Sequence, residues 1–215
     1  MTQLILVRHG ESNVTVRRII GGMRSCTGLS ELGIQQTERL RDRLLRTGEV
    51  KIDSLVCSSM SRAQQTADIM APALGVGAPL AEADWAEQDP GECDGLGFDE
   101  YVAKYGRPVW DLDSEIFKGG ETLRQFQKRI HAVLDRLLDE APDQTVMVVC
   151  HGGVIDAALR HLLQLPPVGQ VMLSTTNTSL TELRQVGEVW QLLRYNDAAH
   201  LEGLRPETPT GVTTA

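Results

Sequence analysis

A short apolar segment near the N-terminus ends abruptly in charged and flexible residues. The run Leu4 to Val7 is followed directly by Arg8-His9-Gly10-Glu11. An apolar run of this length is typical of a strand that is buried on both faces of a parallel sheet, and such sheets bind ligands at the carboxyl ends of their strands. The segment therefore predicts an α/β fold with an arginine and a histidine at one edge of a central sheet.

Two more segments repeat this pattern. Thr145 to Cys150 is apolar and runs into His151-Gly152-Gly153, and an expected strand over Ser54–Cys57 leads into a helix with Arg62 in its first turn. The helix dipole disfavours a cation at that position, and the misfit is resolved if Arg62 faces a bound anion. Parallel strands end at the same edge of a sheet, so four side chains are expected to share one site: Arg8, His9, Arg62 and His151.

Three motifs occur in an order that marks a known family. They are Arg8-His9-Gly10-Glu11, the Ser-x-x-x-Arg-Ala-x-x-Thr-Ala pattern from Ser58 to Ala67, and His151-Gly152. In these motifs and in the late segment Asn177 to Leu183, the chain resembles the histidine phosphatase superfamily, in its phosphoglycerate mutase-like branch. The resemblance runs from Leu4 to about Tyr195. It implies a three-layer α/β sandwich with a mostly parallel central sheet and helices on both faces.

The four side chains suit phosphoryl transfer, which needs positioning and charge neutralisation. Arg8, Arg62 and His151 can neutralise a phosphate without a metal or another cofactor. His9 is the expected nucleophile, because an imidazole can form a phosphohistidine that water then hydrolyses. A histidine at a strand end is often only a satisfied structural residue, and an arginine in a first helical turn is often a surface ion-pair member. Their joint occurrence favours a catalytic site.

The leaving alkoxide also needs a proton donor, and a carboxyl group is suited to that role. Glu87 is the candidate, because the family's catalytic glutamate is followed four residues later by a glycine, here Gly91. The family usually continues with tryptophan, glutamate and glycine, whereas this chain has Cys93-Asp94-Gly95. A carboxylate in such an acidic stretch is more often a solvated loop charge, and Asp89 and Glu92 remain rival donors.

The segment from Val14 to Ser30 is expected to cover the pocket, and its glycines allow close approach of the backbone to a ligand. The family commonly has an asparagine where this chain has Thr15, and glutamine followed by glycine where it has Gly21-Gly22. Arg17 and Arg18 are assigned to the surface, and Arg24 is open between a substrate contact and a surface position. The expected substrate-binding residues are Ser12, Thr15, Gly21, Gly22, Arg24 and Gly152.

Helices and strands alternate in the rest of the chain. Ser30 is expected to cap a helix that runs through Leu45 and is ended by Gly48. A proline near the end of the next helix predicts that this helix stops before Pro72. The remaining expected elements are a short helix over Asp99–Tyr105, a long amphipathic helix over Glu121–Leu138 with Phe126, Ile130, Val133 and Leu137 inward, and strands over Ser179–Leu183 and Val189–Tyr195.

Composition indicates one soluble domain. At 215 residues and 41% hydrophobic content the chain can bury a full core. We place the single catalytic domain at residues 1–200, and the Pro-, Gly- and Thr-rich segment 201–215 is expected to be mobile. A net charge of -8 argues against nucleic-acid binding. No apolar run approaches the roughly 20 residues that span a bilayer, which argues against a membrane partner. Four scattered cysteines fit the reduced thiols of a cytoplasmic protein.

The preferred function is a metal-independent phosphomonoesterase of the histidine acid type, acting on a small phosphorylated substrate. Two alternatives remain: a cofactor-dependent phosphoglycerate mutase, and a non-catalytic phosphate-binding regulatory protein. The family's mutases usually carry longer substrate-binding insertions than the middle of this chain, and the retained nucleophile, cations and candidate acid argue against loss of catalysis. The sequence does not select the phosphomonoester, nor does it choose between a monomer and a homodimer.

Overall fold

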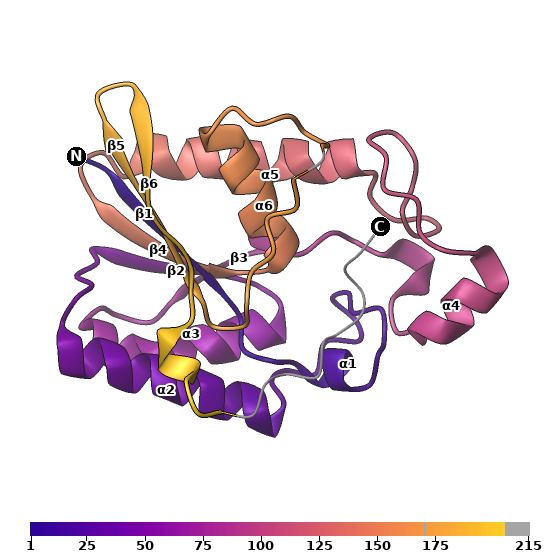
Figure 1. Ribbon diagram of the computed structural model, residues 1–215, viewed down its shortest axis with the longest axis horizontal. Helices are drawn as coiled ribbons and strands as arrows, with labels where there is room; N and C mark the ends of the chain where they lie inside the picture. Colours follow the sequence, from indigo (N-terminus) through magenta and orange to yellow (C-terminus); the bar gives the residue numbers. More distant parts are fainter. Residues whose placement is uncertain (170, 205–215) are drawn as a thin grey trace.

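A six-stranded sheet runs through the middle of the computed structural model, which describes residues 1–169 and 171–204 (Figure 1). The strand order is β3-β2-β4-β1-β5-β6. The first four of these are mutually parallel, and the β5–β6 hairpin is added antiparallel to β1. The bounds are β1 Gln3–Arg8, β2 Ser54–Ser58, β3 Leu80–Glu82, β4 Thr145–Cys150, β5 Leu180–Val186 and β6 Val189–Asp197.

Helices cover both faces of this sheet. In Figure 1, α2 and α3 lie below the sheet and α5 and α6 lie above it, while α4 stands apart at the right. The predicted three-layer α/β sandwich is therefore confirmed. The helices are α1 Asn13–Val16, α2 Glu31–Thr47, α3 Ser61–Leu74, α4 Phe98–Tyr105, α5 Leu123–Glu140 and α6 Gly152–Leu162, with short 3-10 turns η1 Ala83–Trp85, η2 Gly91–Cys93 and η3 Ala199–Leu201.

The alternation of side chains along β1 explains why this strand lies at the centre. Leu4 and Leu6 pack into the cluster formed with α5 and α6, and Ile5 and Val7 pack into the cluster formed with α2 and α3. All four are almost fully buried, and burying a side chain of this size contributes about 1.5–3 kcal/mol. This double-sided burial fixes the strand and, with it, the position of the residues that follow.

Several helix ends follow the local signals in the sequence. The Ser30 side chain accepts a hydrogen bond from the Gly33 amide at the start of α2, and Gly48 adopts a left-handed conformation at its end, as predicted. Helix α5 begins at Leu123, two residues later than expected, because Thr122 and Gln125 form a reciprocal capping box.

The predicted end of α3 before Pro72 is wrong. The helix continues through Pro72 to Leu74 and ends at Gly75, which has φ of 68°. Met70 is fully buried in the cluster with α2, and the partly buried Leu74 packs against the same cluster. Tertiary packing therefore keeps the last turn helical, because the proline removes only one hydrogen bond near the end of the helix.

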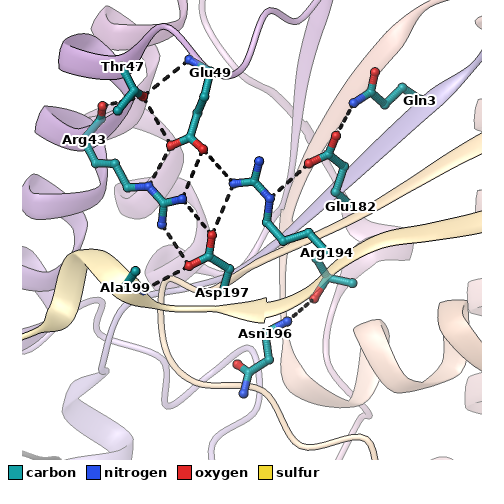
Figure 2. Close-up of polar contacts among 10 residues, drawn as sticks. Gln3, Arg43, Thr47, Glu49, Glu182, Arg194, Asn196, Asp197 and Ala199 are labelled. Atoms are coloured by element: carbon teal, nitrogen blue, oxygen red, sulfur yellow. Dashed lines mark hydrogen bonds and ion pairs between the residues drawn. The ribbon is translucent and has the colours of Figure 1, made fainter.

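A cluster of charged residues ties α2 to the β5–β6 hairpin (Figure 2). The Arg43 guanidinium contacts Glu49 and Asp197 at 2.7 Å each. Arg194 contacts the same two carboxylates at 3.0 and 3.3 Å and reaches Glu182 of β5 at 3.1 Å. The hydrogen bonds from Arg43 lower the pKa of Asp197 from 3.8 to about 2.

The loop after β1 packs against the middle of the chain, and its expected role as a cover of the pocket stays a prediction. The Ile20 amide donates to the Leu96 carbonyl and the Gly95 amide donates to the Ile20 carbonyl, both at 2.9 Å. Ile20, Cys93 and Tyr101 form a small apolar cluster separate from the two clusters on the sheet.

All four cysteines are buried and free, and Cys57 and Cys150 are core residues as predicted.

The end of the chain is described only in part. Residues 205–215 of the segment predicted to be mobile lie outside the described residues. Before them, the Glu202 carbonyl accepts a hydrogen bond of 2.7 Å from Arg39 of α2. Among residues 1–169 and 171–204, no helix is long and apolar enough to cross a membrane.

Candidate active site

His9 lies at the carboxyl end of β1, and both of its backbone polar groups are hydrogen-bonded to distant segments. Its amide donates to the Cys150 carbonyl at 2.9 Å, and its carbonyl accepts from the Asn177 side chain at 2.7 Å. The side chain is buried, and Nδ1 lies 2.6 Å from the Gly10 carbonyl, which assigns the proton to Nδ1. Nε2 therefore carries the lone pair that a nucleophile needs.

Arg62 lies between the two histidines of the site. Its Nε donates to His9 Nε2 at 3.0 Å and lies 3.3 Å from His151 Nδ1. The side chain is 4% exposed, and its buried Nη1 has no hydrogen-bond partner among the described residues. A buried guanidinium donor without an acceptor is costly unless an anion occupies the site, so its position favours a phosphate ligand.

His151 faces His9 from the end of β4. The two ring centroids are 5.1 Å apart with an interplanar angle of 61°, and His151 is fully buried. Its Nε2 lies 2.8 Å from the Ser58 hydroxyl, which leaves Nδ1 as the acceptor for Arg62. Ser58 is the last residue of β2, so three neighbouring parallel strands meet at this point.

Burial is the main reason why both histidines are neutral. Desolvation lowers the pKa of His9 well below 6.5, and the charges of Arg62 and Arg8 lower it further. Burial, followed by Arg62, has the same effect on the pKa of His151. A neutral imidazole keeps its nucleophilic lone pair, and the neighbouring cations that suppress its protonation also attract a phosphate.

Arg8 lies on the same edge, next to the start of α6. Its Nη1 donates to the Thr175 carbonyl. An added Cβ at Gly152 would lie 3.7 Å from both Arg8 Nε and Thr175 Oγ1. The structure thus places Arg8 and Gly152 together, with the N-terminus of an 11-residue helix beside them. Helix N-termini favour anions, which adds to the positive character of this edge.

Glu87 lies between η1 and η2, and its side chain contacts the first turn of α6. Its carboxylate accepts hydrogen bonds of 3.0 Å from the amides of Gly153 and Gln88. The two rival donors are engaged elsewhere: Asp89 accepts from the Gly91 amide at 2.9 Å, and Glu92 forms a 2.8 Å ion pair with Lys118 on the surface. Of the three carboxylates, Glu87 is the one held against the helix that follows His151.

Residues of the expected substrate loop contact the protein itself. The Ser12 and Thr15 hydroxyls are hydrogen-bonded to each other at 3.0 Å. The Asp94 carboxylate accepts from the Gly22 amide at 2.9 Å and lies 3.4 Å from Arg24 Nε.

The other loop contacts are of the same kind. Arg24 also donates to the Gly91 carbonyl at 2.9 Å, and its side chain is 71% exposed. Gly21 packs closely on Val14. Substrate contacts for this loop stay predictions.

Glu11, the last member of the first motif, faces away toward α2. It accepts a hydrogen bond of 2.6 Å from the Ser30 hydroxyl, and its amide donates to the Gln36 side chain at 2.8 Å. An added Cβ at Gly33 would lie 1.9 Å from the Glu11 carbonyl oxygen, so the glycine permits this close contact. Glu11 therefore joins the β1 end to α2.

Several residues of the site were not selected from the sequence. Thr66 accepts from the Gly10 amide at 3.1 Å, and the Thr178 amide donates to the Arg8 carbonyl at 2.8 Å. Thr178 has φ of 56°, a conformation that is costly for a β-branched residue and is found where the surroundings impose it. Ser58 had a usable signal, because it directly follows the predicted strand Ser54–Cys57 at the same edge. Thr178 lies in the late segment that resembles the family, but its sequence gives no signal for its contact with Arg8.

The described part of the chain contains no group of three or more His, Cys, Asp or Glu side chains that could hold a metal ion.

The sequence matches the histidine phosphatase superfamily (branch 1) over residues 4–198, and the chain belongs to this family. It is 30% identical over 207 residues to phosphoglycerate mutase-like protein 4 of Arabidopsis thaliana, covering 93% of this chain and 87% of that protein. It is 28% identical to the uncharacterized phosphatase PhoE of Bacillus subtilis (strain 168), covering 94% and 98%. The structure of mycobacterial glucosyl-3-phosphoglycerate phosphatase, complexed with VO3, superposes with a TM-score of 0.76 at 26% identity, covering 90% and 98%. The predicted resemblance is confirmed.

Proposed function

We propose that this protein is a metal-independent phosphatase that hydrolyses a small phosphomonoester through a phosphohistidine at His9. One observation carries the proposal: Arg62 Nε lies 3.0 Å from the lone-pair nitrogen of a buried, neutral His9, while Arg62 Nη1 has no acceptor among the described residues. This arrangement directs a dianion toward an uncharged nucleophile, as phosphoryl transfer requires.

In the first step, His9 Nε2 attacks phosphorus and a P–N bond forms as the bond to the leaving oxygen breaks. The electron pair of the broken bond stays on that oxygen, which takes a proton from the Glu87 carboxyl group. Arg8, Arg62 and the neighbouring helix N-terminus hold the phosphoryl oxygens. His151 lies beside them as a neutral hydrogen-bonding group.

In the second step, water attacks the phosphohistidine and gives a proton to the Glu87 carboxylate. The P–N bond breaks with its electron pair returning to His9 Nε2, and inorganic phosphate leaves. Glu87 ends the cycle protonated, ready for the next leaving group. Each displacement needs one proton transfer, and one carboxyl group serves both.

The comparisons supply the support for a phosphatase. Two of the relatives described above are named as phosphatases, and one is named as mutase-like. A mutase shares the first step and differs in the second, in which the phosphoryl group returns to a substrate hydroxyl. The two activities therefore differ in the acceptor and not in the nucleophile.

The test is release of inorganic phosphate from a panel of phosphomonoesters in the presence of EDTA, with wild type, His9→Ala and Glu87→Gln. The panel includes 3-phosphoglycerate with and without 2,3-bisphosphoglycerate. The proposal predicts release that is lost in His9→Ala, and slow turnover with retained phosphate binding in Glu87→Gln. The matched control is His161→Ala, because His161 is a partly exposed histidine of α6 that pairs with Asp135 of α5.

Two outcomes contradict the assignment as a phosphatase, and a third contradicts the role of Glu87. Isomerisation of phosphoglycerate with little free phosphate assigns the protein as a mutase. Absence of turnover across the panel, together with binding of inorganic phosphate, assigns it as a phosphate-binding protein. Near-normal activity of Glu87→Gln moves the proton donor to another residue.

A further inference from the structure

Arg129 of α5 contacts the backbone of the segment that carries Glu87. Its Nη1 donates to the carbonyls of Asp84 and Ala86 at 2.8 and 2.9 Å, and its Nη2 lies 3.4 Å from the Glu87 carbonyl. The same guanidinium binds the Glu121 carboxylate through Nε and Nη2 at 2.9 and 2.6 Å. These contacts use all five N–H groups of an arginine.

Glu121 binds the part of the segment that follows Glu87. Its carboxylate accepts from the Asp89 amide, and its own amide donates to the Asp89 carbonyl, both at 3.0 Å. Its carbonyl accepts from the Gln88 side chain at 2.8 Å. The Arg129–Glu121 pair thus holds the backbone before and after Glu87, and both partners are about one-fifth exposed.

Few other backbone hydrogen bonds hold this segment among the residues that the structure describes. Beyond the 3-10 turn Ala83–Trp85, residues 86–89 belong to no helix or strand, and Trp85 is the fully buried anchor. In a strand, the backbone carbonyls of this segment would be paired with a neighbouring strand. Here they are hydrogen-bonded to the Arg129 guanidinium. The Glu87 carboxylate itself rests on the Gly153 and Gln88 amides. Its position at the site therefore depends on where this backbone is held.

We propose that Arg129, through its ion pair with Glu121, is a positioning residue that holds the proton donor Glu87 in reach of the leaving group. This inference rests on the proposed function, because it requires Glu87 to be the acid. The planar guanidinium of an arginine is needed for this role. A lysine has one compact donor centre and cannot reach two carbonyls and a carboxylate together. Among the described residues Arg129 has no hydrogen bond to His9 or Arg62, and a lysine keeps the positive charge that acts on His151, so we expect Arg129→Lys to leave the phosphate site intact.

The experiment compares two substrates that differ in their need for an acid. The leaving group of glycerol phosphate is a strongly basic alkoxide that needs a proton. The leaving group of dinitrophenyl phosphate is a stable phenolate that needs no proton. The measured quantity is kcat/KM, which reports the steps through formation of the phosphoenzyme. For Arg129→Lys we expect a loss of about 10–100-fold on glycerol phosphate, part of the 10²–10⁴-fold that general acid catalysis supplies, and less than about 3-fold on dinitrophenyl phosphate.

The matched control is Arg136→Lys. Arg136 lies on the same helix and contacts the carboxylates of Glu82 and Asp84 at 2.6 and 3.6 Å, close to the same segment. Its replacement is expected to leave the ratio of the two kcat/KM values unchanged. If Arg129→Lys does not fold, Glu121→Gln keeps the shape of the pair, removes its charge, and is expected to shift the ratio in the same direction.

The outcomes separate this inference from the proposed function. An equal loss on both substrates in Arg129→Lys means that the residue only supports the fold, and the inference is overturned. If Glu87→Gln shows the selective loss and Arg129→Lys and Glu121→Gln do not, the inference fails and the acid assignment stands. If Glu87→Gln itself shows no selectivity, Glu87 is not the acid and both fail.

Discussion

Replacement of Asp197 by asparagine tests the charged cluster that joins α2 to the β5–β6 hairpin. The pKa of Asp197 falls from 3.8 to about 2, chiefly because Arg43 donates to it at 2.7 and 3.0 Å. A shift of one pKa unit is worth about 1.4 kcal/mol, so the shift corresponds to about 2.4 kcal/mol. The side chain is partly exposed, and screening by solvent reduces the expected loss to about 1.5 kcal/mol at pH 7.

The sign of the pH dependence follows from the direction of the pKa shift. The pKa of Asp197 is lower in the folded than in the unfolded chain, so its stabilisation is fully present above about pH 5. It is lost as the pH falls from 4 toward 2. The difference in free energy of unfolding between wild type and Asp197→Asn is therefore expected to shrink to about half its neutral value at pH 3.

Urea unfolding at pH 7 and at pH 3 measures this difference. Asp139→Asn is the matched control, because Asp139 is an exposed carboxylate of α5 for which the described residues provide no ion pair. Its replacement is expected to change the unfolding free energy by less than about 0.5 kcal/mol. A loss below that level for Asp197→Asn at pH 7, or a loss that is the same at both pH values, would refute the reasoning.

Three further predictions concern the candidate active site. The ring signals of His9 and His151 are expected not to titrate between pH 8 and 5.5 in an NMR titration, because burial lowers both pKa values well below 6.5; a midpoint near 6.5 contradicts this. Ser58→Ala removes the hydroxyl 2.8 Å from His151 and is expected to lower the free energy of unfolding by about 1–3 kcal/mol, whereas unchanged urea unfolding argues that the bond contributes nothing. Gly153→Ala places a Cβ 2.4 Å from Glu87 Oε1 and is expected to reduce kcat/KM on glycerol phosphate at least about tenfold, and wild-type kinetics would show that this contact is not needed.

The sequence predicted the sheet edge well because that edge depends on local patterns. Buried strands that end in His9 and His151 could be recognised from an apolar run followed by charge and glycine. Arg62 stood out because a cation is disfavoured in a first helical turn. Each of these signals is contained in a few consecutive residues, and the parallel topology then brings the strand ends together.

Other parts of the site depend on contacts between distant residues. Asn177 reaches the His9 carbonyl across 168 positions, and Arg129 reaches the Glu87 segment across more than 40. The local sequence does not indicate which distant backbone groups these two side chains contact. The error in the predicted end of α3 has a related cause, because the burial of Met70 outweighs the local signal of Pro72.

The central claim is covalent catalysis by His9, and rapid-quench trapping of the phosphoenzyme tests it most directly. Wild type mixed with a radiolabelled phosphomonoester in EDTA is expected to give a burst of acid-labile label on His9 that decays to inorganic phosphate, with none in His9→Ala. Turnover without labelled protein, or label that persists in His9→Ala, would contradict the claim.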